Sequence, residues 1–168
     1  YDSSMIRKLT FCFKSIYNDF KEIHMKISNE IINICPEIKK WRHELHAHPE
    51  LGYEEEWTSN FVAEKLESFG LEIHRGMAKT GVVGVLKGAN ASLGGGGNKA
   101  IGLRADMDAL PMTEENDFSY KSKFDGRMHA CGHDGHTAML LGAAKLLSLK
   151  NDFDGTVYFI FQPAEEGG

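Results

Sequence analysis

Residues 137–161 read TAMLLGAAKLLSLKNDFDGTVYFIF: a long apolar segment, a polar turn and a second apolar segment. The first segment, 137–149, is apolar nearly all round, which predicts a helix that is covered on most sides. The second, 156–161, is an unbroken run of β-branched and aromatic residues. Such a run is typical of a central strand of a parallel sheet with both faces buried. A buried helix that leads into a buried strand indicates an α/β fold.

The segment AIGLRA (100–105) predicts the strand that precedes this helix. Strand 100–105, helix 137–149 and strand 156–161 then form a βαβ unit, in which the two strands run parallel. Two further strands are predicted at 71–74 and 81–86. We therefore expect the α/β class, with a largely parallel central sheet flanked by helices.

Two more helices and a glycine-rich connection precede the βαβ unit. Residues 36–46 place Ile38, Trp41 and Leu45 on one helical face, and Pro36 suits the first turn. A second helix is expected from Glu55 to Phe69, with Gly70 as its left-handed stop.

The connection ASLGGGGNKA (91–100) lacks the Gly-Lys-Ser/Thr ending of a phosphate loop, and no helix follows it. It therefore predicts a flexible hairpin connection between strands 81–86 and 100–105.

Composition excludes several classes of partner. The 168 residues suffice for one domain, and a net charge of −5 disfavours nucleic acid, which requires a basic surface. No apolar stretch approaches a membrane span, so no membrane partner is expected. Three cysteines are too few for a disulfide framework and favour a reducing, cytoplasmic location. We assign residues 1–27 to an N-terminal extension. Residues 28–168 are assigned to the N-terminal part of a catalytic α/β domain.

Acidic residues follow both strands of the βαβ unit. Asp106 and Asp108 come at the end of the first strand, and Glu165 and Glu166 follow the second. The carboxyl ends of parallel strands meet at one edge of the sheet, where ligands bind in such folds. The segment CGHDGH (131–136) stands at the start of the intervening helix and should reach the same edge. Each group alone is compatible with ordinary turn, cap or solvated-loop residues, but their convergence favours a functional site.

The residue types at this edge suit a divalent metal ion. Cys131 lies near a helix N-terminus, where the dipole favours a thiolate, and His133 follows two residues later. Glu166 completes a mixed sulfur, nitrogen and oxygen set that zinc, manganese, cobalt or nickel tolerates. A second carboxylate, Glu165, is then available to move protons.

Four motifs also carry a family resemblance, which covers roughly residues 37–168. They resemble the amidohydrolase branch of the dinuclear-metal aminoacylase/carboxypeptidase family, which includes hippurate hydrolases, N-acyl-amino-acid amidohydrolases and auxin-conjugate hydrolases. The motifs are WRHELHAHPELGYEE (41–55), GLRADMDALPM (102–112), MHACGHDGHTAMLLGAA (128–144) and FQPAEEGG (161–168).

The resemblance implies two divalent metal ions, with Cys131, His133 and Glu166 as ligands and Glu165 as the general base. It implies that Asp108 supports the metal shell from behind. Asp106 stands where other branches have a histidine ligand, and its role is left open. For the nearby histidines, packing, capping or substrate contact is expected before metal binding; these are His46, His129 and His136.

The implied activity is metal-dependent hydrolysis of the amide bond of N-acyl amino acids, which are small molecules, by a full-length homodimer. Relatives continue past E-E-G-G with further histidine ligands and an inserted dimerisation domain. Two alternatives therefore stay open. One is a catalytically inactive metal-binding fragment, and the other is a structural zinc domain.

Overall fold

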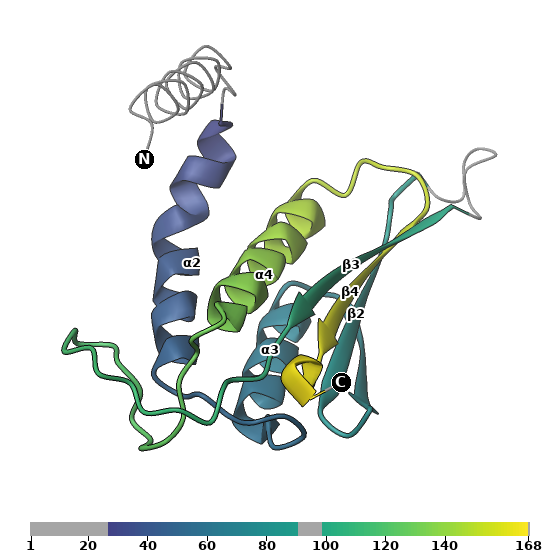
Figure 1. Cartoon of the computed structure of the whole chain (residues 1–168). Coiled ribbons are helices and arrows are strands. Elements are labelled where there is room, and N and C mark those ends of the chain that lie inside the picture. Colours follow the sequence, from purple (N-terminus) through teal and green to yellow (C-terminus); the bar gives the residue numbers. More distant parts are fainter. Residues whose placement is uncertain (1–26, 91–98, 168) are drawn as a thin grey trace, which may run out of the picture. The chain divides into compact units, whose positions relative to one another are not determined.

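Four strands form one sheet in the order β1-β2-β4-β3 (Figure 1). The computed structural model describes residues 27–90 and 99–167. The strands are β1 (Glu72–Met77), β2 (Gly81–Lys87), β3 (Ala100–Asp106) and β4 (Thr156–Gln162). All of them lie in the unit Asn33–Gly168, the second of two compact units, and of the first unit only residues 27–32 are described. The expected extension 1–27 lies almost wholly outside the described residues.

The predicted βαβ unit is confirmed. β3 and β4 are parallel and in register from Ala100↔Thr156 to Asp106↔Gln162, and α4 (His133–Leu149) connects them. Asp106 and Gln162 therefore end at the same level, so the acidic residues that follow the two strands emerge at one edge. The α/β class is confirmed with it.

The pairing of the remaining strands differs from the prediction. β1 pairs with β2 antiparallel, and β2 pairs with β4 antiparallel. The expectation of a largely parallel sheet is thus wrong for these four strands. The turn between β1 and β2 spans only residues 78–80, and a connection that short reverses the chain direction.

The predicted hairpin between β2 and β3 is also wrong. β4 lies between these two strands and forms the ladder hydrogen bonds of both. A late strand of the chain thus occupies the place that a hairpin partner would take. Most of the glycine-rich connection, residues 91–98, lies outside the described residues.

The helix α3 (Glu56–Ser68) matches its prediction within one residue at each end. Gly70 has φ +81° and donates its N–H to the Glu67 carbonyl, while Leu71 N–H reaches the Leu66 carbonyl. This is the Schellman arrangement, so Gly70 ends the helix as expected.

The other two helices begin earlier than predicted. α2 spans Asn29–His46, so Pro36 lies inside it rather than in its first turn. The proline removes one N–H from the helix, yet the hydrogen-bonded turns continue on both sides. α4 begins at His133, four residues before the predicted start at Thr137. The helix therefore includes residues that sequence reasoning placed in the preceding turn.

The core lies between the sheet and the helices, which Figure 1 shows along one face of the sheet. In β4, Val157, Phe159 and Phe161 are buried, whereas the intervening Tyr158 is 40% exposed. The prediction that this strand is buried on both faces is therefore wrong for the described residues, because the helices cover one face only. None of the helices in the described parts of the chain has the length and apolar character needed to cross a membrane.

Two residues of α4 test this packing. Leu141 is 0% exposed, and Met139, two residues earlier, is 62% exposed. Leu141→Ala should lower the free energy of unfolding by about 2–5 kcal/mol, because a cavity forms in the core. Met139→Ala should change it by about 0.5 kcal/mol or less. Urea denaturation measures both, and equal losses would contradict the assigned helix orientation.

Candidate metal and catalytic site

His133 is the most constrained side chain of the predicted cluster. It is the first residue of α4 and follows Gly132, whose φ of +94° turns the chain into the helix. The ring is 3% exposed, and its Nδ1 lies 2.9 Å from the Asp108 carbonyl oxygen and 3.1 Å from Asp108 Oδ1. Both partners are acceptors, so Nδ1 carries the proton and donates. The lone pair of Nε2 is thereby left available to bind a metal ion.

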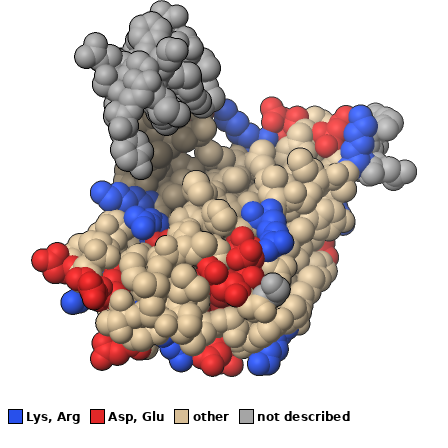
Figure 2. Space-filling view, viewed as in Figure 1, with Lys and Arg blue, Asp and Glu red and all other residues tan. Residues whose placement is uncertain are grey.

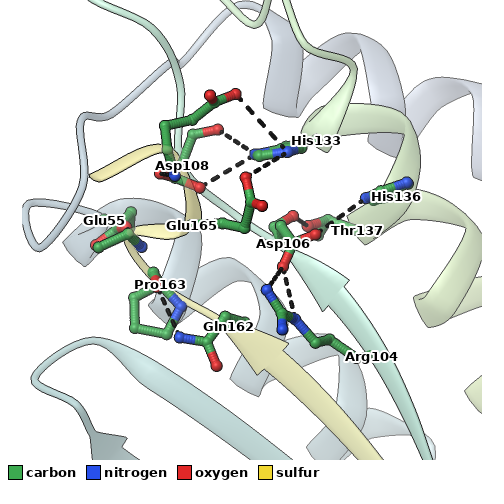
Figure 3. A network of polar contacts seen from close by, with 12 residues as sticks. Glu55, Arg104, Asp106, Asp108, His133, His136, Thr137, Gln162, Pro163 and Glu165 are labelled. Atoms are coloured by element: carbon green, nitrogen blue, oxygen red, sulfur yellow. Dashed lines mark hydrogen bonds and ion pairs between the residues drawn. The ribbon is translucent and has the colours of Figure 1, made fainter. Parts of the chain in front are cut away.

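Asp108 connects this histidine to the acidic turn after β4. Its carboxylate is buried, and Oδ2 accepts a hydrogen bond from the Glu166 backbone N–H at 2.9 Å. The two acids Glu165 and Glu166 lie in a short 3-10 turn, Glu165–Gly167. One buried carboxylate therefore fixes both the ring of His133 and the turn that carries the acids (Figure 3).

The three residues predicted as ligands come together in space. Cys131, His133 and Glu166 each offer one ligand atom, and these atoms lie within 4.8 Å of one another. Nε2 of His133 is 3.9 Å from Glu166 Oε1 and 3.8 Å from Glu165 Oε2. In Figure 2, acidic side chains gather near the middle of the face where Figure 1 draws the turn after β4. The tertiary structure thus unites segments that are about thirty residues apart.

The charge around Cys131 differs from the expectation. A hydrogen bond to the Glu166 carboxylate raises the pKa of the thiol most, followed by burial and by the charges of Glu166, Glu165 and Asp108. Without a metal ion, these contacts favour the protonated thiol rather than the expected thiolate. The same crowding of negative charge favours a divalent cation, which in turn stabilises a thiolate. A thiolate, an imidazole with a free Nε2 and a carboxylate fit such an ion.

A second group of possible ligands lies next to the first, but its carboxylate is paired with an arginine. Asp106, His133 and His136 also bring ligand atoms within 4.8 Å of one another. However, Arg104 approaches Asp106 Oδ1 with Nε at 2.8 Å and Nη2 at 2.7 Å, and His136 Nδ1 lies 3.4 Å from Oδ2. A guanidinium on this carboxylate disfavours a second cation there. Asp106, whose role the sequence left open, thus forms an ion pair at the end of β3.

His46 lies outside the ligand cluster, in a buried network of charges. Its Nδ1 is 2.7 Å from Asp134 Oδ2 and its Nε2 is 3.0 Å from Glu114 Oε1, while Arg42 Nε donates to Asp134 Oδ2 at 2.9 Å. The hydrogen bond to Asp134 raises the pKa of His46 most, and that to Glu114 adds to it against the opposing effect of burial. With a carboxylate at each ring nitrogen, His46 therefore joins the start of α4 to the 112–127 segment.

His129 is buried as a neutral ring. Burial lowers its pKa to about 4, and among the described residues neither ring nitrogen has a hydrogen-bond partner. It is not in the ligand cluster.

Sequence reasoning did not single out two acidic residues that support this site. Glu114 pairs with His46, and Glu55 accepts a hydrogen bond from the backbone of Ala164, next to Glu165. Glu55 does lie in the first of the four motifs, which is the one signal that could have marked it. The burial of an isolated acid is not visible in a sequence.

Comparisons with known proteins agree with this geometry. A profile of peptidase family M20/M25/M40 matches residues 102–168. The hippurate hydrolase of Campylobacter jejuni is 52% identical over 143 residues, covering 85% of this chain and 36% of that protein. The N-acyl-L-amino acid amidohydrolase of Geobacillus stearothermophilus is 51% identical over 143 residues, covering 82% and 37%. The resemblance to this peptidase family is confirmed.

A solved structure shows the same relationship. The Bacillus subtilis YXEP protein, described as a dinuclear metal binding peptidase from the M20 family, has a TM-score of 0.71 and 43% identity. The match covers 78% of this chain and 35% of that one. The chain thus spans little more than a third of the length of these three proteins.

The raised pKa of His46 generates a prediction for stability. Because the folded state raises this pKa, the stabilisation is complete below the ordinary histidine value of about 6.5 and is lost as the pH rises through the folded value. His46→Gln should therefore cost about 3 kcal/mol at about pH 6 and less at about pH 9. Urea denaturation at both pH values measures this. His74→Gln, at an exposed histidine of β1, is the control, and a cost for His46→Gln that does not change with pH would contradict the assignment.

Proposed function

We propose that the complete protein hydrolyses the amide bond of N-acyl amino acids with the help of two divalent metal ions. The observation that carries the proposal is the position of His133 Nε2, which faces Glu166 at 3.9 Å and Glu165 at 3.8 Å in one cluster with Cys131. This cluster stands at the edge where the parallel strands end. The curated relatives, named hippurate hydrolase and N-acyl-L-amino acid amidohydrolase, support the choice of bond.

Cys131, His133 and Glu166 would hold metal. When bound, the ions polarise the amide carbonyl and make water more acidic. Asp108 keeps the proton of His133 on Nδ1, so that Nε2 remains a donor of its lone pair. The hydrogen bond from Glu166 N–H to Asp108 then sets the distance between the carboxylate ligand and the imidazole ligand.

The two glutamates divide the work. The Glu166 side chain is 25% exposed, its backbone is held by Asp108, and its carboxylate belongs to the ligand cluster. The Glu165 side chain is 41% exposed, and its Oε2 faces the same histidine nitrogen. Glu165 is therefore the residue that can reach both water and substrate. It takes a proton from the attacking water and returns it to the leaving nitrogen.

The identity of the metal, the assembly, the location and the partners are proposals that rest on the sequence. The metal is zinc, manganese, cobalt or nickel, in keeping with the mixed donor set. The complete protein is a cytoplasmic homodimer without nucleic-acid or membrane partners. The rival function is metal binding without turnover by this chain alone, which the three clustered ligands also support. Metal content and turnover of the 168-residue chain separate the two.

The catalytic proposal is tested with N-acetyl and N-benzoyl amino acids as substrates. Hydrolysis by the complete protein should stop with a chelator and return with added metal. Glu165→Ala should lower kcat by about 10²–10⁴-fold, the range of a lost general base. Glu64→Ala, at an exposed glutamate of α3, is the matched control and should keep wild-type activity. Hydrolysis that is insensitive to the chelator, or full activity in Glu165→Ala, would sink the proposal.

The ligand assignment has a test that does not depend on activity. Cys131→Ala and His133→Ala should each reduce the metal bound at equilibrium, measured by mass spectrometry of metal content after dialysis. His136→Ala should leave it unchanged, because His136 pairs with Asp106, which Arg104 already neutralises. Loss of metal in His136→Ala alone would instead assign the ion to the Asp106 group.

A further inference from the structure

Glu55 is a fully buried acid that the proposed mechanism does not yet use. Its residue is 0% exposed, and both carboxylate oxygens are engaged. Oε2 accepts a hydrogen bond from Thr80 Oγ1 at 2.6 Å, and Oε1 accepts one from the backbone N–H of Ala164 at 2.8 Å. Figure 3 draws Glu55 beside Pro163, where the acidic turn begins. Burying a carboxylate is costly, so its partners indicate what it does.

An acid at the start of a helix usually caps the free N–H groups of its first turn, but in α3 another residue does this. Glu55 is the N-cap of α3, but its side chain makes no capping hydrogen bond. Glu50 caps the helix instead, since its two oxygens accept the N–H groups of Trp57 at 3.0 Å and Thr58 at 2.8 Å. The Glu55 carboxylate is thus free of its own helix and turns toward Thr80 and Ala164.

Backbone strain in the described residues gathers around this carboxylate. Only four described residues other than glycine have positive φ: Tyr53 (65°), Ala78 (46°), Lys79 (80°) and Ala164 (52°). Tyr53 is two residues before Glu55, Ala78 and Lys79 immediately precede its partner Thr80, and Ala164 is its other partner. A residue with a Cβ in this conformation costs about 1–2 kcal/mol, and such strain concentrates at functional sites.

The strained Ala164 directly precedes Glu165. Its Cβ is packed so closely that a Cβ built on Gly52 would lie 3.0 Å from it. On the other side of Glu165, the N–H of Glu166 is bound by Asp108. Two buried carboxylates therefore hold the backbone on both sides of Glu165, while the Glu165 side chain itself stays accessible.

We propose that Glu55 is a positioning residue that holds the acidic turn in its strained conformation and so sets the place of the Glu165 carboxylate. The inference rests on the proposed function of Glu165 as general base. Asp108 fixes the turn to the metal ligand His133, and Glu55 fixes it to the start of α3 and to the β1–β2 turn. Loss of the Glu55 contact lets Ala164 relax and moves Glu165 away from its working position.

The test uses the complete, metal-loaded protein. Glu55→Ala should lower kcat by about 10–100-fold, the scale of a small misplacement of a catalytic group, with KM and bound metal within about twofold. Glu55→Gln should keep kcat within about threefold, because its amide oxygen still accepts from Ala164 and its NH₂ group can donate to Thr80 Oγ1. Glu64→Ala, at an exposed glutamate of the same helix α3, is the matched control and should also keep kcat within about threefold.

A second readout is independent of activity. Hydrogen–deuterium exchange of the peptide that contains residues 162–167 should accelerate in Glu55→Ala, but not in Glu55→Gln or Glu64→Ala. If the wild-type protein hydrolyses no N-acyl amino acid, the proposed function fails, and the exchange pattern still decides whether Glu55 holds the turn.

Three results would overturn the inference. These are a folded Glu55→Ala variant with wild-type kcat, a Glu55→Gln variant as impaired as Glu55→Ala, and wild-type exchange of the acidic turn in Glu55→Ala. Should Glu55→Ala fail to fold, Glu55→Asp replaces it, because it keeps the charge but draws the carboxylate back by one methylene. It should show the same loss of kcat and faster exchange, and wild-type values for both would reject the proposal.

Discussion

The site depends on one buried carboxylate, that of Asp108. It accepts hydrogen bonds from Nδ1–H of His133 and from the backbone N–H of Glu166, so it joins the start of α4 to the turn after β4. Asp108 follows β3, which is in register with β4, and this parallel pairing brings all three parts to one level. An acid between two donors also determines which nitrogen of His133 is free. The hydrogen bonds of Asp108 thus supply both the geometry and the tautomer that a metal site requires.

Negative charge dominates the space in front of His133. Glu165 and Glu166 approach its Nε2. A hydrogen bond to Glu166, followed by burial and by the charges of Glu166, Glu165 and Asp108, raises the pKa of the Cys131 thiol. Such an arrangement is unfavourable without a cation and becomes favourable with one, which is why a metal ion fits these residues. Arg104 neutralises the adjacent Asp106 and so confines the uncompensated charge to the Cys131 cluster. The two neighbouring acidic groups thereby differ in what they can bind.

Much of this arrangement could be predicted from the sequence. The βαβ unit follows from three apolar segments, and the clustering of Cys131, His133 and Glu166 follows from their places at its ends. The pairing of β2 could not be predicted, because periodicity identifies strands but not their neighbours, and β4 lies between β2 and β3. The one-sided burial of β4 could not be predicted either. An apolar run in the sequence looks the same whether neighbours cover one face of the strand or both.

The sequence by itself determined the chemical types and their order: acids after two strands, and a cysteine and a histidine before a helix. Local propensity and residue spacing are enough to determine this order, because strands, helices and their ends are recognised from a few neighbouring residues. Only the tertiary structure decided which acids lie beside His133, which form ion pairs and which are buried among backbone donors. Asp106 meets Arg104, Asp108 meets His133, and Glu55 meets Ala164 across 109 positions of the chain. The role of a carboxylate is set by the donors that burial brings to it, and those donors come from distant segments.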